Sequence, residues 1–163
     1  MILLGLGGNL PVGGHATPRA TLEAALAALP AHGIAVAALS PWFASAPVPA
    51  SDQPWYVNAV ARIETALLPE GALAALHAVE REFGRKRGAP NAARTVDLDL
   101  LAWGRLVRLA GPPPLLPHPR MGLRAFVLAP LAELAPGWRH PSSGQTAAAM
   151  LAGLPPEQAV RRL

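Results

Sequence analysis

The sequence predicts an α+β fold in a single domain, with an antiparallel sheet at its centre. A chain of 163 residues is enough for one domain and short for two. Hydrophobic residues make up 52% of the chain and charged residues 15%, which supports a sizeable core and excludes a wholly disordered protein. Apolar runs of strand length alternate along the chain with amphipathic stretches of helix length, and glycine or proline lies at their borders.

The first third of the chain predicts a strand, a helix and a second strand. Residues 1–6 form an apolar run that ends in a glycine-rich turn, as expected for a buried strand. The pair Thr17-Pro18 supplies a capping hydroxyl and a proline for the first helical position, and leucines at helical spacing follow it. The helix is expected to end by Gly33, and residues 34–43 are expected to form the second strand.

The rest of the chain predicts two more strands and three more helices. Residues 45–54 contain three prolines and are expected to form a loop. Alternation over residues 56–66 predicts a strand, residues 69–83 predict a helix, and residues 96–103 predict the fourth strand. The C-terminal third is rich in proline and is expected to add helices near 125–134 and 145–151.

The predicted order of strand, helix, strand, strand, helix, strand is that of the split βαβ, or ferredoxin-like, core. We therefore expect a four-stranded antiparallel sheet with helices on its faces and a C-terminal extension. One face of the sheet is left for a ligand or for the C-terminal segments.

Several classes of protein are excluded by what the chain lacks. Cysteine is absent, so there are no disulfides, zinc ribbons or thiol nucleophiles. The N-terminus lacks the basic region of a secretion signal, and no apolar run reaches the roughly 18 residues of a membrane span. We expect a cytoplasmic protein.

A phosphate-bearing partner is one explanation of the charge balance. The formal net charge is +4, and 13 of the 14 basic residues are arginines, which suit forked contacts to phosphate oxygens. Codon usage in a GC-rich genome explains the arginines equally well. Five basic residues fall in one short stretch: Arg81, Arg85, Lys86, Arg87 and Arg94.

An aspartate pair in the fourth predicted strand is the sharpest candidate for chemistry. Asp97 and Asp99 point to one face of that strand, while the leucines beside them point into the core. Paired carboxylates repel unless a positive charge lies between them, and Mg²⁺ prefers such oxygen ligands. The alternative is a surface pair held by arginines.

Other motifs near the site are weaker. Residues 5–10 lack the last glycine of the dinucleotide fingerprint, and residues 8–15 lack the lysine of a P-loop. His118 is flanked by prolines and is either a phosphate contact or a structural residue.

Three further side chains allow two interpretations each. Glu80 lies on the apolar stripe of its helix, where its partner is either an arginine or a ligand hydroxyl. Tyr56 and Phe126 either belong to the core or enclose a planar heterocycle between them.

From Leu4 to about Pro136 these segments resemble the 6-hydroxymethyl-7,8-dihydropterin pyrophosphokinase family of folate biosynthesis. The resemblance rests on motifs in the family's order and spacing, which are Gly7-Gly8-Asn9-Leu10, Asp52-Gln53-Pro54-x-Tyr56-x-Asn58, Glu80-x4-Arg85, Arg94-x2-Asp97-Leu98-Asp99, Pro117-His118-Pro119-Arg120-Met121 and Arg124-x-Phe126. It implies one pyrophosphokinase domain over residues 1–163 that transfers pyrophosphate from ATP to the pterin hydroxymethyl group and releases AMP. It further implies a monomer that uses ATP, the pterin and two Mg²⁺ ions, with no nucleic acid or membrane as partner.

The same resemblance implies a role for each site residue. The residues implied to be catalytic are Arg85, Arg94, Asp97 and Asp99, with the two aspartates as metal ligands. Those implied to bind the pterin are Ser45, Ala46, Val48, Tyr56, Asn58 and Phe126, with the two rings stacked on either side of it. Those implied to bind ATP are His77, Glu80, Arg87, Leu100, His118 and Arg124.

The sequence departs from the family pattern at a few positions. Gly8 replaces the usual serine, His77 replaces a commoner glutamine, and Pro119 replaces a frequent aromatic residue. The loop between Arg87 and Arg94 lacks a tryptophan found in some members. These changes concern contacts to adenine and the loops, and they leave the aspartate pair and the two rings in place.

Two other functions fit parts of the sequence. An RNA-binding ferredoxin-like module fits the many arginines, but the aromatic content is only 5% and an acidic pair occupies a strand. A metal-dependent phosphohydrolase would use Asp97 and Asp99 but has no need of two facing rings.

Overall fold

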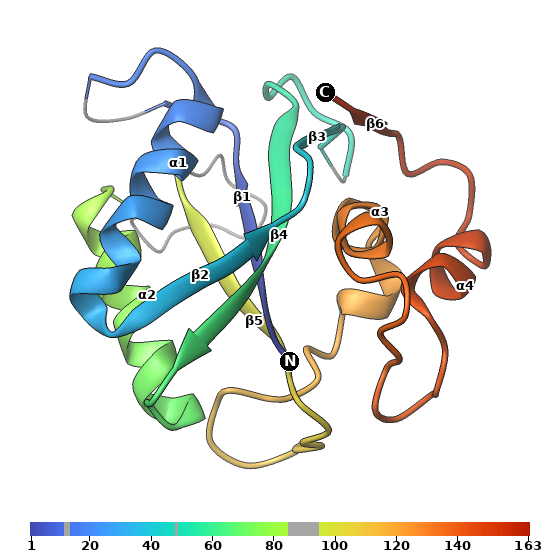
Figure 1. The fold of residues 1–163 in the computed structure, drawn as a ribbon. Helices are drawn as coiled ribbons and strands as arrows, with labels where there is room; N and C mark the ends of the chain where they lie inside the picture. The colour runs from blue at the N-terminus through green and yellow to red at the C-terminus, as the bar shows by residue number, and fades with distance from the viewer. Residues whose placement is uncertain (12–13, 48, 85–94) are drawn as a thin grey trace.

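The chain folds around one antiparallel sheet that carries helices on both faces (Figure 1). The computed structural model describes residues 1–11, 14–47, 49–84 and 95–163. Within these residues the sheet has six strands in the order β5-β1-β4-β3-β6, and β2 also pairs with β4. The strands are β1 (Ile2–Gly8), β2 (Ile34–Leu39), β3 (Phe43–Ser45), β4 (Tyr56–Thr65), β5 (Asp97–Trp103) and β6 (Val160–Arg162).

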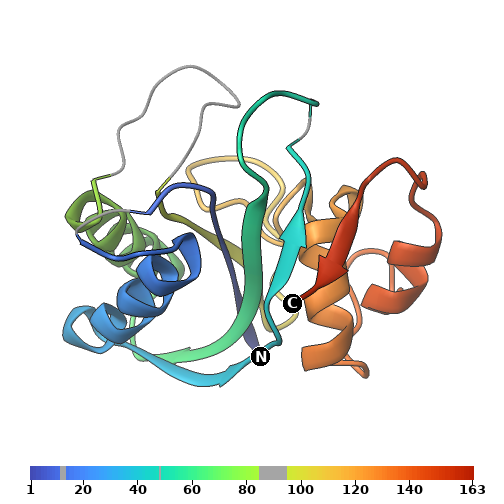
Figure 2. The same cartoon turned by 90° about the horizontal axis from the view of Figure 1, so that it is seen from above.

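Helices cover the two faces of the sheet as separate layers (Figures 1 and 2). One layer holds α1 and α2, and the other holds α3 and α4. The helices are α1 (Pro18–Ala28), η1 (Leu29–His32), α2 (Pro69–Glu82), η2 (Met121–Leu123), α3 (Ala125–Leu134) and α4 (Ala147–Ala152). Among the described residues, no helix is both long enough and apolar enough to cross a lipid bilayer.

Local signals set the ends of the helices. The hydroxyl of Thr17 accepts a hydrogen bond from a backbone N–H in the first turn of α1. The chain leaves η1 at Gly33, whose φ of 85° favours glycine. The last helix begins at Ala147, two residues later than predicted, because the hydroxyl of Thr146 caps it there.

The predicted ferredoxin-like order is confirmed, since β1 lies between β5 and β4 and every strand pair is antiparallel. The sheet has six strands rather than four for two reasons. The strand predicted over residues 34–43 is instead two strands, β2 and β3, which are separated at residues 40–42, where Pro41 has no N–H for the ladder. The sixth strand, β6, comes from the C-terminal extension and pairs with β3, as Figure 2 shows.

β1 gives the two faces of the sheet different characters. Leu4 and Leu6 are buried against the α1–α2 layer. On the other face Leu3 packs with the α3–α4 layer, but Gly5 and Gly7 follow on that face without side chains. The α3 side of the sheet is therefore packed at one end and hollow at the other.

Candidate active site

A pocket of about 440 Å³ opens on the α3 side of the sheet. Its floor comes from β1, β4 and β5, and its walls come from the loop after β3, the turn before α3 and the segment before β6. Its lining includes the predicted site residues Ser45, Ala46, Tyr56, Asn58, Asp97, Asp99, Arg124 and Phe126. Residues from six parts of the sequence thus meet in one cavity.

The two glycines of β1 create the hollow floor. In the strand register Gly5 lies opposite Asp99, and Gly7 lies opposite both Asp97 and Asn58. A Cβ atom added to Gly7 would lie 3.1 Å from Oδ1 of Asn58, a tight approach for any side chain. Glycine at this position therefore leaves room for the Asn58 amide and for a ligand above it.

The carboxylate pair stands at one end of this floor. Asp97 and Asp99 are both half-buried and lie on the same face of β5. Nη1 of Arg124 approaches Oδ2 of Asp99 to 4.0 Å, so a guanidinium group borders the pair. Among the described residues, no three acidic, histidine or cysteine side chains gather as a metal cage. Two carboxylates with an open side are suited to a hydrated Mg²⁺ that also binds phosphate oxygens.

Glu80 fixes the backbone that carries the two aspartates. This residue of α2 is 3% exposed, and its Oε2 accepts a hydrogen bond of 3.0 Å from the N–H of Leu98. Leu98 lies between Asp97 and Asp99 and packs into the α1–α2 core. The N–H of Leu98 is a partner that neither sequence interpretation of Glu80 named, and this hydrogen bond links the buried carboxylate to the position of β5.

A buried amide and a buried hydroxyl form the opposite end of the pocket. Nδ2 of Asn58 donates a hydrogen bond of 2.7 Å to Oγ of Ser45, and both side chains are almost fully buried. The backbone N–H of the neighbouring Ala46 donates to the carbonyl of Ala159 at 3.1 Å. That N–H is therefore occupied by the C-terminal segment. Val48 lies outside the described residues.

Two aromatic side chains line the pocket from different walls. Tyr56 comes from β4 and Phe126 from α3, and the guanidinium carbon of Arg124 lies 5.4 Å from the centre of the Phe126 ring. The hydroxyl of Tyr56 donates to Oε1 of Gln53 at 3.4 Å. Gln53 also accepts a hydrogen bond of 3.1 Å from the buried Asn9, which ties the loop after β3 to the end of β1.

His118 is half-buried beside the charged end of the pocket. Its backbone N–H donates a hydrogen bond of 2.8 Å to the carbonyl of Leu101. Its ring Nδ1 accepts a hydrogen bond of 3.1 Å from the backbone N–H of Arg120. Burial lowers the pKa of His118 from 6.5 to about 4, and the charge of Arg124 adds to this effect while Asp97 opposes it. The ring is therefore neutral near pH 7, with its proton on Nε2.

The low pKa of His118 predicts a pH dependence of stability. Between pH 6.5 and about 4 the unfolded chain binds a proton at this ring that the folded chain does not. The folded state therefore loses stability as the pH falls through this window. We expect His118→Gln to lose less stability than the parent when urea unfolding is compared at about pH 7 and about pH 5. An equal loss in both proteins would contradict the assignment.

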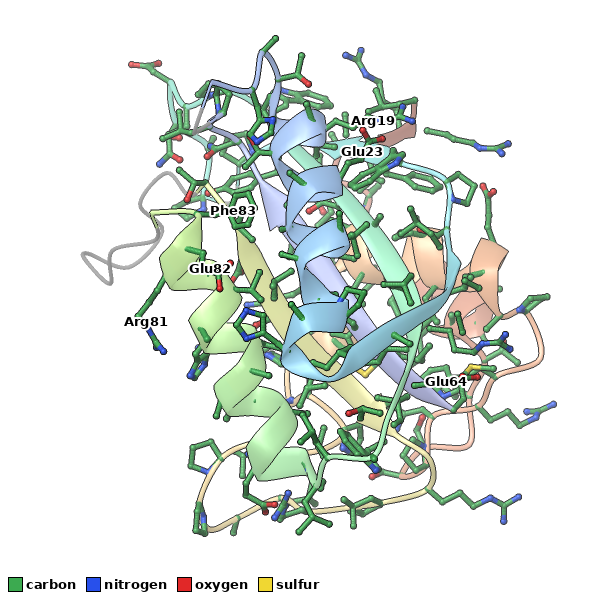
Figure 3. All side chains as sticks on the ribbon, turned by 60° about the vertical axis from the view of Figure 1, so that its left-hand side comes forward. Arg19, Glu23, Glu64, Arg81, Glu82 and Phe83 are labelled. Carbon is green, nitrogen blue, oxygen red and sulfur yellow. The ribbon has the colours of Figure 1, made fainter. Side chains whose placement is uncertain are left out.

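Some predicted site residues are not brought into the pocket. Glu80, His77 and Leu100 belong to α2 and β5, and none of them lines the cavity. The side chain of Leu100 is buried in the core on the α1–α2 side of the sheet, the side that Figure 3 brings forward. The arginines that are predicted to be catalytic or to bind ATP, Arg85, Arg87 and Arg94, lie outside the described residues.

The pocket also includes residues to which sequence analysis gave no role. Gln53 appeared only as part of a motif, and Arg120 only as a neighbour of His118. Gln158 had no signal at all, because it belongs to the C-terminal segment far from the other lining residues. Only the folded structure, in which β6 pairs with β3, brings Gln158 to the pocket.

Comparisons with known proteins agree over most of the chain. A family described as 7,8-dihydro-6-hydroxymethylpterin-pyrophosphokinase (HPPK) matches residues 3–136. A Pseudomonas aeruginosa protein named 2-amino-4-hydroxy-6-hydroxymethyldihydropteridine pyrophosphokinase is 42% identical over 157 residues, which are 94% of this chain and 91% of that protein. A Synechocystis protein of the same name is 39% identical over 148 residues, which are 88% of this chain and 71% of that protein.

A solved structure supports the fold. The chain resembles the crystal structure of a Plasmodium falciparum HPPK-DHPS triple mutant with SDX-DHP, with a TM-score of 0.69 and 12% identity. The match covers 93% of this chain and 43% of that one, so this chain spans less than half of the larger protein. At this level of identity the likeness concerns the fold alone.

Proposed function

The chain belongs to the 7,8-dihydro-6-hydroxymethylpterin-pyrophosphokinase family, and on this basis we propose how its residues perform the reaction. The chain is an ATP-dependent diphosphotransferase of folate biosynthesis. It transfers pyrophosphate from ATP to the hydroxymethyl group of 6-hydroxymethyl-7,8-dihydropterin, which gives AMP and the pterin diphosphate. The observation that carries the assignment of residues is that one pocket holds the carboxylate pair, the buried amide and the two aromatic rings.

We propose that Asp97 and Asp99 hold two Mg²⁺ ions together with the phosphate oxygens of ATP. The donor set fits, because both ligands are carboxylates on one face and the strand opposite them carries glycines. When bound, the ions neutralise the charge that develops on the phosphates during transfer. Arg124, which already lies beside Asp99, adds a fixed positive charge at the same place.

The amide end of the pocket is proposed to recognise the pterin. A pterin ring is flat and carries hydrogen-bond donors and acceptors on one edge, which the Asn58–Ser45 pair can match. Tyr56 and Phe126, which line the pocket from different walls, are proposed to stack on its two faces. Because the backbone N–H of Ala46 is occupied, any contact from this residue has to come from another atom.

The triphosphate is proposed to extend from the carboxylates toward His118 and the arginines. His118 in its neutral form offers an Nε2–H donor to a phosphate oxygen. We propose that Arg85, Arg87 and Arg94 also contact phosphate oxygens of ATP. The adenosine would lie toward His77 and Leu100, and Glu80 would act by holding β5 in position.

The remaining proposals concern the state of the protein in the cell. We propose a single catalytic domain over residues 1–163 that works as a monomer in the cytoplasm. A single copy of the chain supplies the pocket described above. Its partners are then ATP and the pterin, with no role for a nucleic acid or a membrane.

The Gly7→Ala variant tests the pterin end of the pocket. The added methyl group would lie 3.1 Å from Oδ1 of Asn58, closer than an ordinary van der Waals contact, so the amide has to move by a few tenths of an ångström. We expect the Kd of the pterin to rise about tenfold, which corresponds to one disturbed hydrogen bond. Gly137→Ala is the matched control, because a Cβ there meets no atom within 4 Å. Equal pterin affinity in the two variants would contradict the proposed contact.

The first experiment on function is to measure AMP released from ATP and Mg²⁺, with and without 6-hydroxymethyl-7,8-dihydropterin. Pterin-dependent AMP without ADP is the expected result. Phosphate release that does not depend on the pterin would instead favour a phosphohydrolase. Strongly salt-dependent RNA binding without ATP turnover would favour the nucleic-acid module.

A further inference from the structure

Gln158 holds the backbone on both sides of Arg124. Its Oε1 accepts a hydrogen bond of 2.8 Å from the N–H of Ala125, and its Nε2 donates one of 2.9 Å to the carbonyl of Leu123. Arg124 is the N-cap residue of α3, but its side chain makes no capping hydrogen bond. The first N–H groups of a helix lack partners within the helix. Gln158 supplies one such partner from a distant part of the chain.

The segment around Gln158 is also attached to the opposite wall of the pocket. β6 pairs with β3, and the carbonyl of Ala159 accepts the N–H of Ala46. The guanidinium of Arg161 lies 5.1 Å from the centre of the Trp55 ring, next to Tyr56. Figure 2 shows β6 beside β3 on the side of the molecule that carries α3 and α4. One short segment therefore contacts both walls of the cavity.

We infer that residues 158–162 form a strap that sets the width of the pocket, with Gln158 as a positioning residue for Arg124 and Phe126. Both ends of the Gln158 amide are hydrogen-bonded to backbone groups, so this residue acts through the residues that it holds. Phe126 lies one residue beyond the N–H that Gln158 fixes. The strap lies beyond residue 136, where the match to the family ends. The inference rests on the proposed pterin site.

The Gln158→Met variant tests the role of Gln158, because methionine keeps the length of the side chain and removes both hydrogen bonds. We expect the Kd of the pterin, measured with Mg²⁺ and a saturating non-hydrolysable ATP analogue, to rise about tenfold. The melting temperature should fall by no more than about 5 °C. Glu157→Met is the control, since Glu157 is the exposed neighbour in the same segment. It should bind the pterin like the parent.

Two further variants separate positioning from a general loss of structure. Gln158→Glu keeps an oxygen that accepts the N–H of Ala125 but replaces the donor that faces the carbonyl of Leu123 with a second oxygen, so it should bind the pterin more weakly than the parent. In a Phe126→Ala background, Gln158→Met should change the Kd by less than about twofold, because the ring that it positions is absent. A full tenfold effect in that background, or a Gln158→Glu protein that binds the pterin like the parent, would overturn the inference.

Measurements on the parent protein separate a failure of the strap from a failure of the proposed function. If the parent binds the pterin and Gln158→Met binds it equally well, the strap is wrong and the proposed function stands. If the parent neither binds the pterin nor releases AMP in its presence, the proposed function fails first.

Discussion

The Asp97→Asn variant is expected to lose at least about a thousandfold of pyrophosphate transfer while it keeps its fold. Asparagine preserves the size of the side chain but removes the negative charge that holds the metal. A metal ion that stabilises the transferring phosphates contributes several kcal/mol, and about 4 kcal/mol corresponds to a thousandfold in rate. The measurement is pterin-dependent AMP release at saturating ATP and Mg²⁺, together with the melting temperature.

The control for this variant is Glu64→Gln. Glu64 is an exposed carboxylate on β4, in the same sheet but away from the pocket, and Figure 3 shows it at the end of the strand. Its substitution removes one negative charge by the same chemical change, so it should leave AMP release unaltered. Comparable activity in Asp97→Asn and Glu64→Gln would remove Asp97 from the metal site.

Tyr56→Ala is expected to weaken pterin binding by about 10- to 100-fold while ATP affinity stays nearly unchanged. Stacking between an aromatic side chain and a nucleic-acid base contributes about 1–3 kcal/mol, and a pterin is a comparable flat heterocycle. Tyr56 lines the pocket on the same floor strand as Asn58, and β1 separates that strand from the aspartates of β5. Titration calorimetry with the pterin and with an ATP analogue measures the two affinities separately.

Tyr56→Phe separates the ring from its hydroxyl group. Phenylalanine keeps the stacking surface and loses only the hydrogen bond of 3.4 Å to Gln53. It should therefore bind the pterin within about threefold of the parent, since a long hydrogen bond contributes little. If Tyr56→Phe were as damaging as Tyr56→Ala, the hydroxyl and its link to the loop would matter more than the ring.

Much of the fold follows from signals that lie a few residues apart. The Thr17 hydroxyl and Gly33 mark helix ends, and both signals act on backbone groups within one turn. Asp97 and Asp99 share a face in any extended strand, because side chains alternate. Such features are decided by local geometry, so the amino-acid order was enough to predict them.

The sequence did less well where a short element depends on its neighbours. The break between β2 and β3 falls at residues 40–42 inside a run that predicts one strand, and β6 has three residues and no pattern of its own. β3 and β6 are short strands that form by pairing with a strand already in the sheet, β3 with β4 and β6 with β3. The site residues beyond the described ranges, Arg85, Arg87 and Arg94, stay predictions.

Order along the chain thus determined the core elements, the family and the carboxylate pair of this protein. The tertiary structure alone decided which distant side chains share the pocket. Asn9 and Gln53 are 44 residues apart, and Gln158 is 33 residues from the N–H that it caps. A glutamine amide has no periodicity that reveals its partner, and its two hydrogen bonds can form only after the intervening chain has packed.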